Sequence, residues 1–304
     1  MTAELWRLPR ADGGYPAQLH DLDEPPAALH GIGDANLVRG ITRESAITIV
    51  GSRHPSAYGL EVAGELGYLL AGAGLVVVSG MALGIDSAAH RGALEAGGPT
   101  VAVLGGGPDV VYPRSERRLY ESIVAGGAVV SEMPPGTAPG PGCFPRRNRI
   151  MAALGTMTVV VEAAQPSGSL ITAERASKLG REVGAVPGRV TTRVAQGTNG
   201  LLADGAAVIR GAQDVLDRML GVGIQRTRRS GPSLEPELAR LVEAVEGGAS
   251  TPDAAALAAG MSAADAAVGL ARLELLGYLR VDGAGRYVRT PMAVPETEVS
   301  SLDP

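Results

Sequence analysis

The sequence predicts an α/β protein: a parallel sheet with helices on both faces, followed by a small second domain. Apolar strand candidates and helical patterns alternate from Ile47 to about Asp217, which is typical of parallel strands joined by right-handed crossovers. The length of 304 residues leaves room for one large and one small domain. The strand candidates are 46–50, 75–79, 100–104, 127–131, 157–161, 183–186 and 206–209, and the helical patterns are 59–72, 85–97, 114–126, 147–154, 169–180, 198–204 and 212–220.

The first strand and the turn after it carry the first sign of a binding site. Residues 46–50 are rich in the β-branched side chains that suit a buried parallel strand. The next turn contains Gly51, Ser52 and Arg53 and leads into a helix, so backbone N–H groups and a planar cation can face an anion. The turn lacks the second close-approach glycine of the dinucleotide-binding fingerprint. From this turn alone, phosphate binding and a purely structural turn both remain open.

Composition narrows the class of protein. Cys143 is the only cysteine, which excludes an internal disulfide and a thiolate zinc cluster and fits a reducing cytoplasm. The four histidines are isolated in the sequence, so we expect neither a metal site nor a cofactor. There is no signal-peptide pattern and no apolar run near the roughly 20 residues that span a bilayer, so we expect no membrane association. The net charge of −5 excludes a wholesale basic coat, so any polyanion must bind at a local patch.

Small, hydroxylic and arginine residues follow nearly every predicted strand. Ligands of such sheets bind at the carboxyl ends of the strands, so these loops predict an anion site lined by backbone. One glycine loop is weak support, whereas a whole rim of them is strong support. The rim contains Gly51-Ser52-Arg53, Ser79–Asp86, Gly105-Gly106-Gly107 with Arg114 beyond it, Phe144–Arg149, Ser167-Gly168-Ser169 and Pro187-Gly188-Arg189.

Three arginines at one predicted helix start indicate an anion. Arg146, Arg147 and Arg149 sweep most of a helical turn, so they cannot all face one ligand. They also oppose the helix dipole, a cost that suggests a bound anion. Phe144 directly precedes them, and an aromatic ring beside arginines is suited to stacking a base while its phosphate is held. A phenylalanine that simply plugs the core fits the sequence equally well.

Two glutamates at strand ends are candidate catalytic carboxylates. Glu132 and Glu162 follow the fourth and fifth strand candidates of the predicted sheet. No second acid and no metal cluster accompanies either of them, so we expect both to pair with nearby arginines instead.

The two ends of the chain have different characters. Residues 1–45 are polar and proline-rich and predict an extended arm packed on the core, with 37–41 adding a short strand or cap. Residues 46–220 form the sheet domain, 221–233 a linker, 234–290 a winged-helix domain of three helices and a hairpin, and 291–304 a disordered tail. The would-be recognition helix carries Asp265, Arg272 and Glu274, a poor charge for duplex DNA. We therefore favour a protein-contact or modulatory role for the second domain over sequence-specific DNA reading.

The rim motifs together resemble the DNA-processing protein A family (DprA, also called Smf). The resemblance covers about residues 10–218 and is carried by many motifs in order. They are Val50-Gly51-Ser52-Arg53 with Tyr58-Gly59, Val78–Asp86 with Ala89-His90, Val103–Gly107 with Tyr112-Pro113, Ser131-Glu132, Phe144–Ile150, Val161-Glu162-Ala163, Ser167–Thr172 and Val186-Pro187-Gly188.

The resemblance implies an extended Rossmann-like domain that binds single-stranded DNA, forms a homodimer and helps to load the RecA recombinase during natural transformation. It implies no established catalytic activity. It implies that the strand contacts are Arg53 and the segment Phe144, Arg146, Arg147, Asn148 and Arg149, with Arg114 where the family often has lysine. Gly51 and Ser52 belong to the same turn as Arg53, and Ser167, Gly168 and Ser169 would line the same pocket. Many family members begin with a small helical domain, and here the chain starts too close to the sheet to contain one.

A Rossmann-like nucleotide-phosphate hydrolase is the alternative function. It would use Glu132 or Glu162 as acid or base, with the glycine rim holding one phosphate. Such enzymes carry a Pro-Gly-Gly-x-Gly-Thr type of loop followed by a glutamate, which this sequence lacks.

Overall fold

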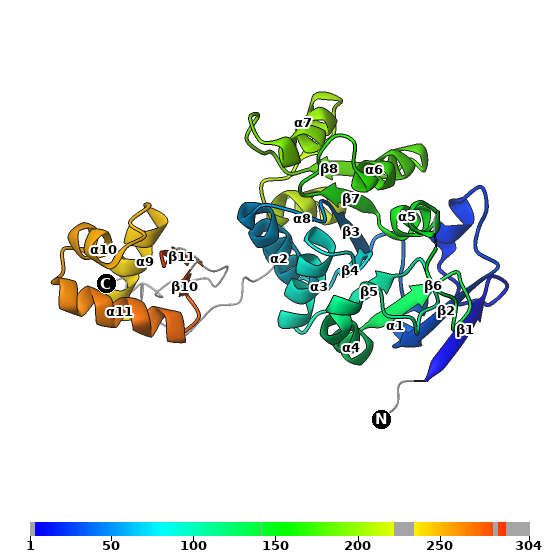
Figure 1. The fold of residues 1–304 in the computed structure, drawn as a ribbon, viewed down its shortest axis with the longest axis horizontal. Helices are drawn as coiled ribbons and strands as arrows, with labels where there is room; N and C mark the ends of the chain where they lie inside the picture. Colours follow the sequence, from blue (N-terminus) through cyan, green and yellow to red (C-terminus); the bar gives the residue numbers. More distant parts are fainter. Residues whose placement is uncertain (1–3, 141, 222–233, 282–284, 290–304) are drawn as a thin grey trace, which may run out of the picture. The chain divides into compact units, whose positions relative to one another are not determined.

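A computed structural model describes residues 4–140, 142–221, 234–281 and 285–289 (Figure 1). The chain divides into two compact units, Met1–Gln225 and Arg226–Pro304. The larger unit holds the nine-stranded sheet.

A nine-stranded sheet forms the centre of the larger unit, with the order β1-β2-β6-β5-β4-β3-β7-β8-β9. Strands β3 to β9 run parallel to one another where they pair. The extended Rossmann-like sheet predicted from the sequence is therefore confirmed. The strands are β1 (Leu5–Pro9), β2 (Ala28–Gly33), β3 (Ala46–Val50), β4 (Val76–Ser79), β5 (Thr100–Val103), β6 (Ala128–Ser131), β7 (Met157–Val160), β8 (Glu182–Ala185) and β9 (Ala207–Val208).

The N-terminal segment contributes more structure than the extended arm that was predicted. β2 pairs antiparallel with β6, and β1 pairs antiparallel with β2, so the sheet is mixed at this edge. Of the two alternatives predicted for 37–41, a short strand or a cap, the strand is wrong, because Ala35–Arg39 form helix α1. Asp34 caps that helix by accepting hydrogen bonds from the backbone N–H groups of Asn36 and Leu37.

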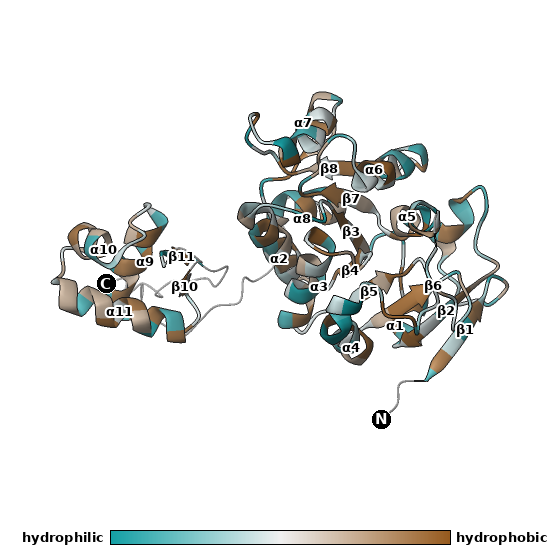
Figure 2. Ribbon diagram, viewed as in Figure 1, coloured by the Kyte–Doolittle hydropathy of each residue, from teal (hydrophilic) through white to brown (hydrophobic). Residues whose placement is uncertain are grey.

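Helices cover both faces of the sheet, as predicted (Figure 1). Ile47 and Ile49 of β3 pack with α2, α3 and α8 on one face. Val50 of the same strand packs with α5 on the other face, so consecutive residues are buried on opposite sides. This explains why the central strands are apolar along most of their length (Figure 2). The helices of this unit are α1, α2 (Ala57–Gly72), α3 (Ile85–Glu95), α4 (Arg117–Gly126), α5 (Cys143–Leu154), α6 (Gly168–Lys178), α7 (Gln196–Ala203) and α8 (Ala212–Leu220), with short 3₁₀ turns η1 (Ala17–Asp21), η2 (Arg114–Glu116) and η3 (Arg193–Ala195).

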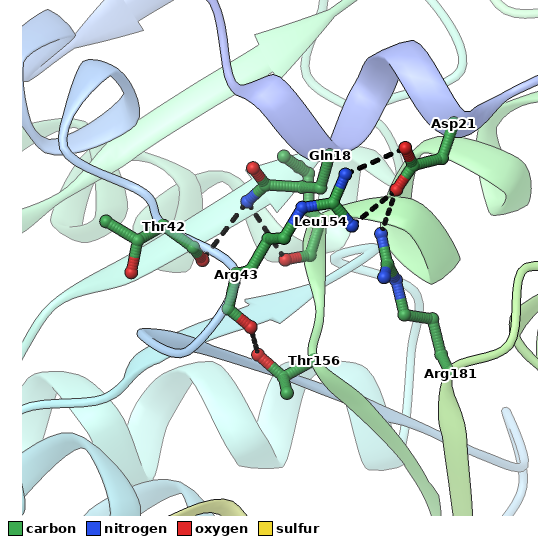
Figure 3. Close-up of polar contacts among 7 residues, drawn as sticks. All are labelled: Gln18, Asp21, Thr42, Arg43, Leu154, Thr156 and Arg181. Atoms are coloured by element: carbon green, nitrogen blue, oxygen red, sulfur yellow. Dashed lines mark hydrogen bonds and ion pairs between the residues drawn. The ribbon is translucent and has the colours of Figure 1, made fainter.

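One carboxylate ties the N-terminal segment to the sheet domain (Figure 3). Asp21 at the end of η1 accepts hydrogen bonds from Arg43, at 2.8 Å, and from Arg181, at 2.6 Å. Nearby, the Gln18 amide donates to the carbonyl oxygens of Thr42 and Leu154. These contacts of Asp21 and Gln18 join η1 to the segments that precede β3 and β8.

We expect Asp21→Asn to weaken the larger unit in a pH-dependent way. The hydrogen bond from Arg43, assisted by Arg181, holds the pKa of Asp21 below its ordinary value of 3.8. A lowered pKa stabilises the fold above the unfolded pKa, and this contribution is lost as pH falls through the folded value. The loss near pH 7 should be at most about 1 kcal/mol because the carboxylate is partly exposed. Urea unfolding at pH 7 and pH 3 measures it; an equal difference at both pH values, or an equal loss in the exposed neighbour variant Asp23→Asn, would contradict the assignment.

The smaller unit contains three helices and a two-stranded hairpin in the part that the structure describes. They are α9 (Pro236–Glu246), α10 (Pro252–Ala259), α11 (Ala263–Leu275), β10 (Leu279–Val281) and β11 (Tyr287–Arg289), and the two strands pair antiparallel. Leu241, Leu270 and Tyr278 are fully buried in its own apolar core. Gly221 apart, the predicted linker lies outside the described residues, and so does the predicted tail 291–304.

No single helix among the described residues combines the length and the apolar character needed to cross a bilayer. Helices α10 and α11 meet those criteria only as a pair, and the pair is bent by 106°.

Candidate nucleic-acid interface

The strand order places a crevice beside β3. The chain proceeds from β3 to β4, β5 and β6 on one side and from β7 to β8 and β9 on the other. The loops that follow β3 and β7 therefore diverge, which is where open α/β sheets bind ligands. An open hollow of about 520 Å³, here called the trough, occupies this place. It is lined by Val50, Gly51, Ser52, Arg53, Ala82, Asp86, Phe144, Pro145, Arg147, Asn148, Met151, Ala164, Pro166, Ser167, Gly168, Ser169, Ile171 and Thr172.

A smaller hollow of about 70 Å³, here called the slot, adjoins the trough. The two share Arg53, Ala82, Phe144 and Arg147, and Tyr112 closes part of the slot. The loops after β4 and β5 supply most of its remaining walls, including Gly80, Gly105 and Gly106. Five of the predicted rim loops contribute residues to these two hollows, whereas Pro187-Gly188-Arg189 line neither of them.

The first turns of two helices reach the trough. Helix α6 begins at Gly168 and is capped by Ser167, whose hydroxyl accepts from the backbone N–H of Ser169. Helix α5 begins at Cys143 rather than at residue 147, because Pro145 lies in the first turn, where its missing N–H costs no hydrogen bond. The positive ends of both helix dipoles therefore favour an anion in the trough.

Arg53, Phe144 and Tyr112 form a stack at the junction of trough and slot. The Arg53 guanidinium carbon lies 5.4 Å from the centre of the Phe144 ring. The Tyr112 ring packs against the Phe144 ring, and the two ring centroids are 5.3 Å apart. Arg53 is exposed, and the structure gives it no carboxylate partner among the residues described. Phe144 is half-buried and lines both hollows, so it does not plug the core. Sequence reasoning did not include Tyr112 in the site.

Arg147 forms the floor of the site. It is 5% exposed, donates from Nη1 to the carbonyl oxygens of Gly80 and Val103, and donates from Nε to Asn148. A Cβ atom at Gly80 would lie 2.2 Å from Nη1, so only glycine fits where β4 ends. Burial lowers the pKa of Arg147 to about 10, which leaves the guanidinium charged near neutral pH.

Asp86 is the one carboxylate of the trough lining, and sequence reasoning had not assigned it a role. Its Oδ2 accepts hydrogen bonds from the backbone N–H groups of Gly80, at 3.1 Å, and Ala82, at 3.4 Å. Burial raises its pKa, while Arg147 acts in the opposite direction. Between Gly80 and Ala82, Met81 adopts a φ of 53°, a strained conformation that this network holds.

Two of the arginines predicted to contact DNA form ion pairs with a glutamate of the same chain. Arg149 is 8% exposed, lies 2.5 Å from Glu132 and donates to the carbonyl of Glu24. Arg146 is exposed and lies 3.1 Å from the same carboxylate. The predicted pairing of Glu132 with arginines is confirmed. Glu132 thus supplies the anion that the helix start demands, so these arginines do not themselves require a bound ligand.

Glu162 caps a helix and pairs with no arginine in the described part of the chain, so that prediction is wrong. The carboxylate accepts hydrogen bonds from the Ser56 N–H, at 2.8 Å, and from the Ser56 hydroxyl, at 2.6 Å. Ser56 is the N-cap of α2, and a carboxylate is stabilising at that end of a helix. A Cβ at Gly59 would lie 2.4 Å from Glu162, which explains the glycine in the first turn.

The predicted site residues fall into two groups. The described lining of the trough includes neither Arg114, which is exposed at the start of η2, nor Arg146 and Arg149. Arg146 borders a neighbouring hollow with Glu132. Among the described residues, no group of three or more His, Cys, Asp or Glu side chains is placed to hold a metal ion. The residues brought together in the trough are Gly51, Ser52, Arg53, Phe144, Arg147, Asn148, Ser167, Gly168 and Ser169.

Known proteins resemble this chain in sequence and in fold. The putative DNA processing protein DprA of Mycobacterium tuberculosis is 40% identical, over 92% of this chain and 73% of its own length. DNA processing protein A of Streptococcus pneumoniae has a solved structure that is 38% identical, with a TM-score of 0.65 over 71% of this chain and 74% of that one.

A second solved structure concerns the single-stranded DNA binding mode of DNA processing protein A from Helicobacter pylori. It is 29% identical, with a TM-score of 0.64 over 72% of this chain and 97% of that one. The family model for DNA recombination-mediator protein A matches residues 7–220, nearly the whole of the larger unit. The resemblance predicted from the rim motifs is thereby confirmed, and the chain belongs to the DNA recombination-mediator protein A family.

Proposed function

We propose that this protein binds single-stranded DNA in the trough and acts as a recombination mediator in DNA processing. The observation that carries the proposal is the exposed Arg53 stacked on Phe144 at the edge of a trough lined by backbone and two helix starts. The family membership and the single-stranded DNA binding described for the Helicobacter pylori relative support the choice of ligand.

The chemistry of the trough suits an unpaired strand. Arg53 and the first turns of α5 and α6 offer donors to phosphate, which every nucleotide carries. Phe144 and Tyr112 offer aromatic rings on which a base of any type stacks. Binding through such contacts tolerates sequence and depends strongly on salt.

The proposal includes the partners that the family resemblance implies. These are RecA, onto which the protein would pass strands during natural transformation, and a second copy of this chain in a homodimer in the cytoplasm. The helices and hairpin of the smaller unit fit a winged helix. The exposed Asp265, Arg272 and Glu274 of α11 favour a protein partner over a DNA duplex for that unit.

We also propose that the protein is not an enzyme. The two carboxylates that a nucleotide-phosphate hydrolase would use are engaged, since Glu132 binds two arginines and Glu162 caps α2. A nucleotide-release assay with several mononucleotides tests this, and turnover that Glu162→Gln abolishes would favour the hydrolase.

We expect Arg53→Ala to weaken single-stranded DNA binding at fixed salt by about tenfold or more. This is the loss of affinity that corresponds to the usual free energy of one hydrogen bond to a charged group. The slope of log affinity against log salt should fall by about 0.7 if one phosphate contact is lost. Arg114→Ala is the matched control, because Arg114 is also exposed and also has no carboxylate partner among the described residues. Fluorescence anisotropy with a labelled oligonucleotide measures both variants. Unchanged binding by Arg53→Ala, or equal losses in the two, would exclude the trough as the site.

A further inference from the structure

The trough contains a carboxylate oxygen that its proposed ligand does not explain. Asp86 is 5% exposed and lines the trough, and its Oδ2 is held by the N–H groups of Gly80 and Ala82. Oδ1 has no hydrogen-bond partner among the described residues. One oxygen therefore fixes the side chain, and the other remains available as an acceptor inside the trough.

A carboxylate repels phosphate, so Asp86 is not a contact for the DNA backbone. The cations nearest to it are Arg147, from α5, and Arg53, from the turn after β3. Both of these also line the trough. Phosphate can therefore lie against Arg53 and the start of α6, while the floor at Asp86 must receive a part of the ligand that carries N–H donors.

Given the proposed single-stranded DNA binding, we infer that Asp86 Oδ1 accepts a hydrogen bond from the Watson–Crick edge of an unpaired base. Each base carries a donor on that edge: N1–H and the 2-amino group of guanine, the 4-amino group of cytosine, the 6-amino group of adenine, and N3–H of thymine. In a duplex the donors that form the base pairs are used. A lone acceptor at the floor thus selects unpaired strands without selecting a sequence.

The geometry favours one hydrogen bond over a two-point contact. A bidentate contact with guanine would need both carboxylate oxygens, and Oδ2 already accepts from two backbone N–H groups. Phe144 and Asp86 line the same trough, so a base stacked near the ring can present its edge to the floor. Asp86 is on this basis a residue that determines strand selectivity, whereas Arg53 determines affinity.

The test pairs one protein variant with one modified base. Thymine has a single Watson–Crick donor, so methylation at N3 removes it without changing the phosphates. Binding of the full chain to labelled oligo(dT) is compared with binding to N3-methylated oligo(dT) of the same length, for the wild type and for Asp86→Asn. The amide oxygen of Asn can still accept from Gly80 and Ala82, but its NH₂ group cannot accept from thymine.

We expect methylation to weaken wild-type binding by roughly ten- to a hundredfold, the range for a hydrogen bond to a charged acceptor. In Asp86→Asn the methylation penalty should shrink to less than about twofold, and the preference for single over double strands should narrow. Asp109→Asn is the matched control: it removes the same charge from an exposed carboxylate that binds the N–H of Gly136, outside the trough lining. It should keep the full methylation penalty.

The outcomes separate the inference from the function on which it rests. A methylation penalty of equal size in wild type and Asp86→Asn means that the methyl group clashes, and overturns the inference. Tighter binding of every strand by Asp86→Asn, with the penalty unchanged, reduces Asp86 to a repulsive charge and also overturns it. If Asp86→Asn does not fold, the wild type alone provides the test. Equal binding of N3-methylated and unmodified oligo(dT) by the wild type would overturn the inference. Failure of the wild type to bind unmodified oligo(dT) overturns the proposed function itself.

Discussion

Replacing Arg147 by methionine is expected to lower the free energy of unfolding of the larger unit by about 3–5 kcal/mol, the usual cost of breaking a buried charged network. Methionine fills much of the volume but leaves the carbonyl oxygens of Gly80 and Val103 without their donor. It also removes the cation that offsets the buried Asp86. Strand binding should fall as well, because the floor of the trough would lose its shape.

Fluorescence of Trp6, the only tryptophan, reports unfolding of the larger unit separately from the smaller one. Its indole N–H donates to the Gly33 carbonyl at the edge of the sheet, so its signal follows the fold. Arg146→Met is the matched control: the side chain is 60% exposed, and its ion pair should contribute at most about 1 kcal/mol. Equal urea midpoints for the two variants would show that Arg147 does not hold the strand ends together.

Alanine at Gly67 and alanine at Gly64 should change stability in opposite directions, although both glycines lie in α2. A Cβ at Gly67 would lie 2.1 Å from the Ala89 carbonyl oxygen of α3, and backbone cannot move aside cheaply. We therefore expect a loss of about 1–3 kcal/mol from overpacking. A Cβ at Gly64 meets only the Ala88 oxygen at 4.0 Å, so Gly64→Ala should stabilise by about 0.5–1 kcal/mol through helix propensity.

The same Trp6 signal in urea measures this pair. The two glycines are about one helical turn apart in α2 and both face α3, so they differ chiefly in how closely the backbone of α3 approaches. A stabilising Gly67→Ala would mean that α2 and α3 do not approach as closely as the structure has them, while a destabilising Gly64→Ala would show that the helix cannot accept any added side chain on this face.

The sheet and its helices were predictable because their signal is local. Residues 46–50 and the later apolar runs are buried on both faces of the sheet, so each strand is recognisable in the sequence as a continuous run of apolar residues. The antiparallel strands β1 and β2 were missed because they lie at an edge, where the burial pattern is mixed and no long apolar run marks them.

The loops that form the rim at the strand ends could also be predicted from the sequence, because their motifs are recognisable without coordinates. Which members of the rim face the ligand could not be predicted. Arg146, Arg147 and Arg149 are nearly adjacent in the chain, yet successive residues of a helix are rotated by about 100°. Arg147 therefore forms the trough floor, whereas exposed Arg146 and buried Arg149 both pair with Glu132 outside the trough lining.

Only the tertiary structure decided how each charge is compensated. Glu162 reaches Ser56 and Arg147 reaches the carbonyl oxygens of Gly80 and Val103, contacts between distant chain segments that the order of strands in the sheet brings together. The sequence by itself determined that small residues and arginines occupy the loops at the carboxyl ends of one parallel sheet. The packing of α5 across that sheet gave Arg146, Arg147 and Arg149 partners within the chain, so Arg53 is the arginine of the trough lining that meets a phosphate, because no carboxylate among the described residues pairs with it.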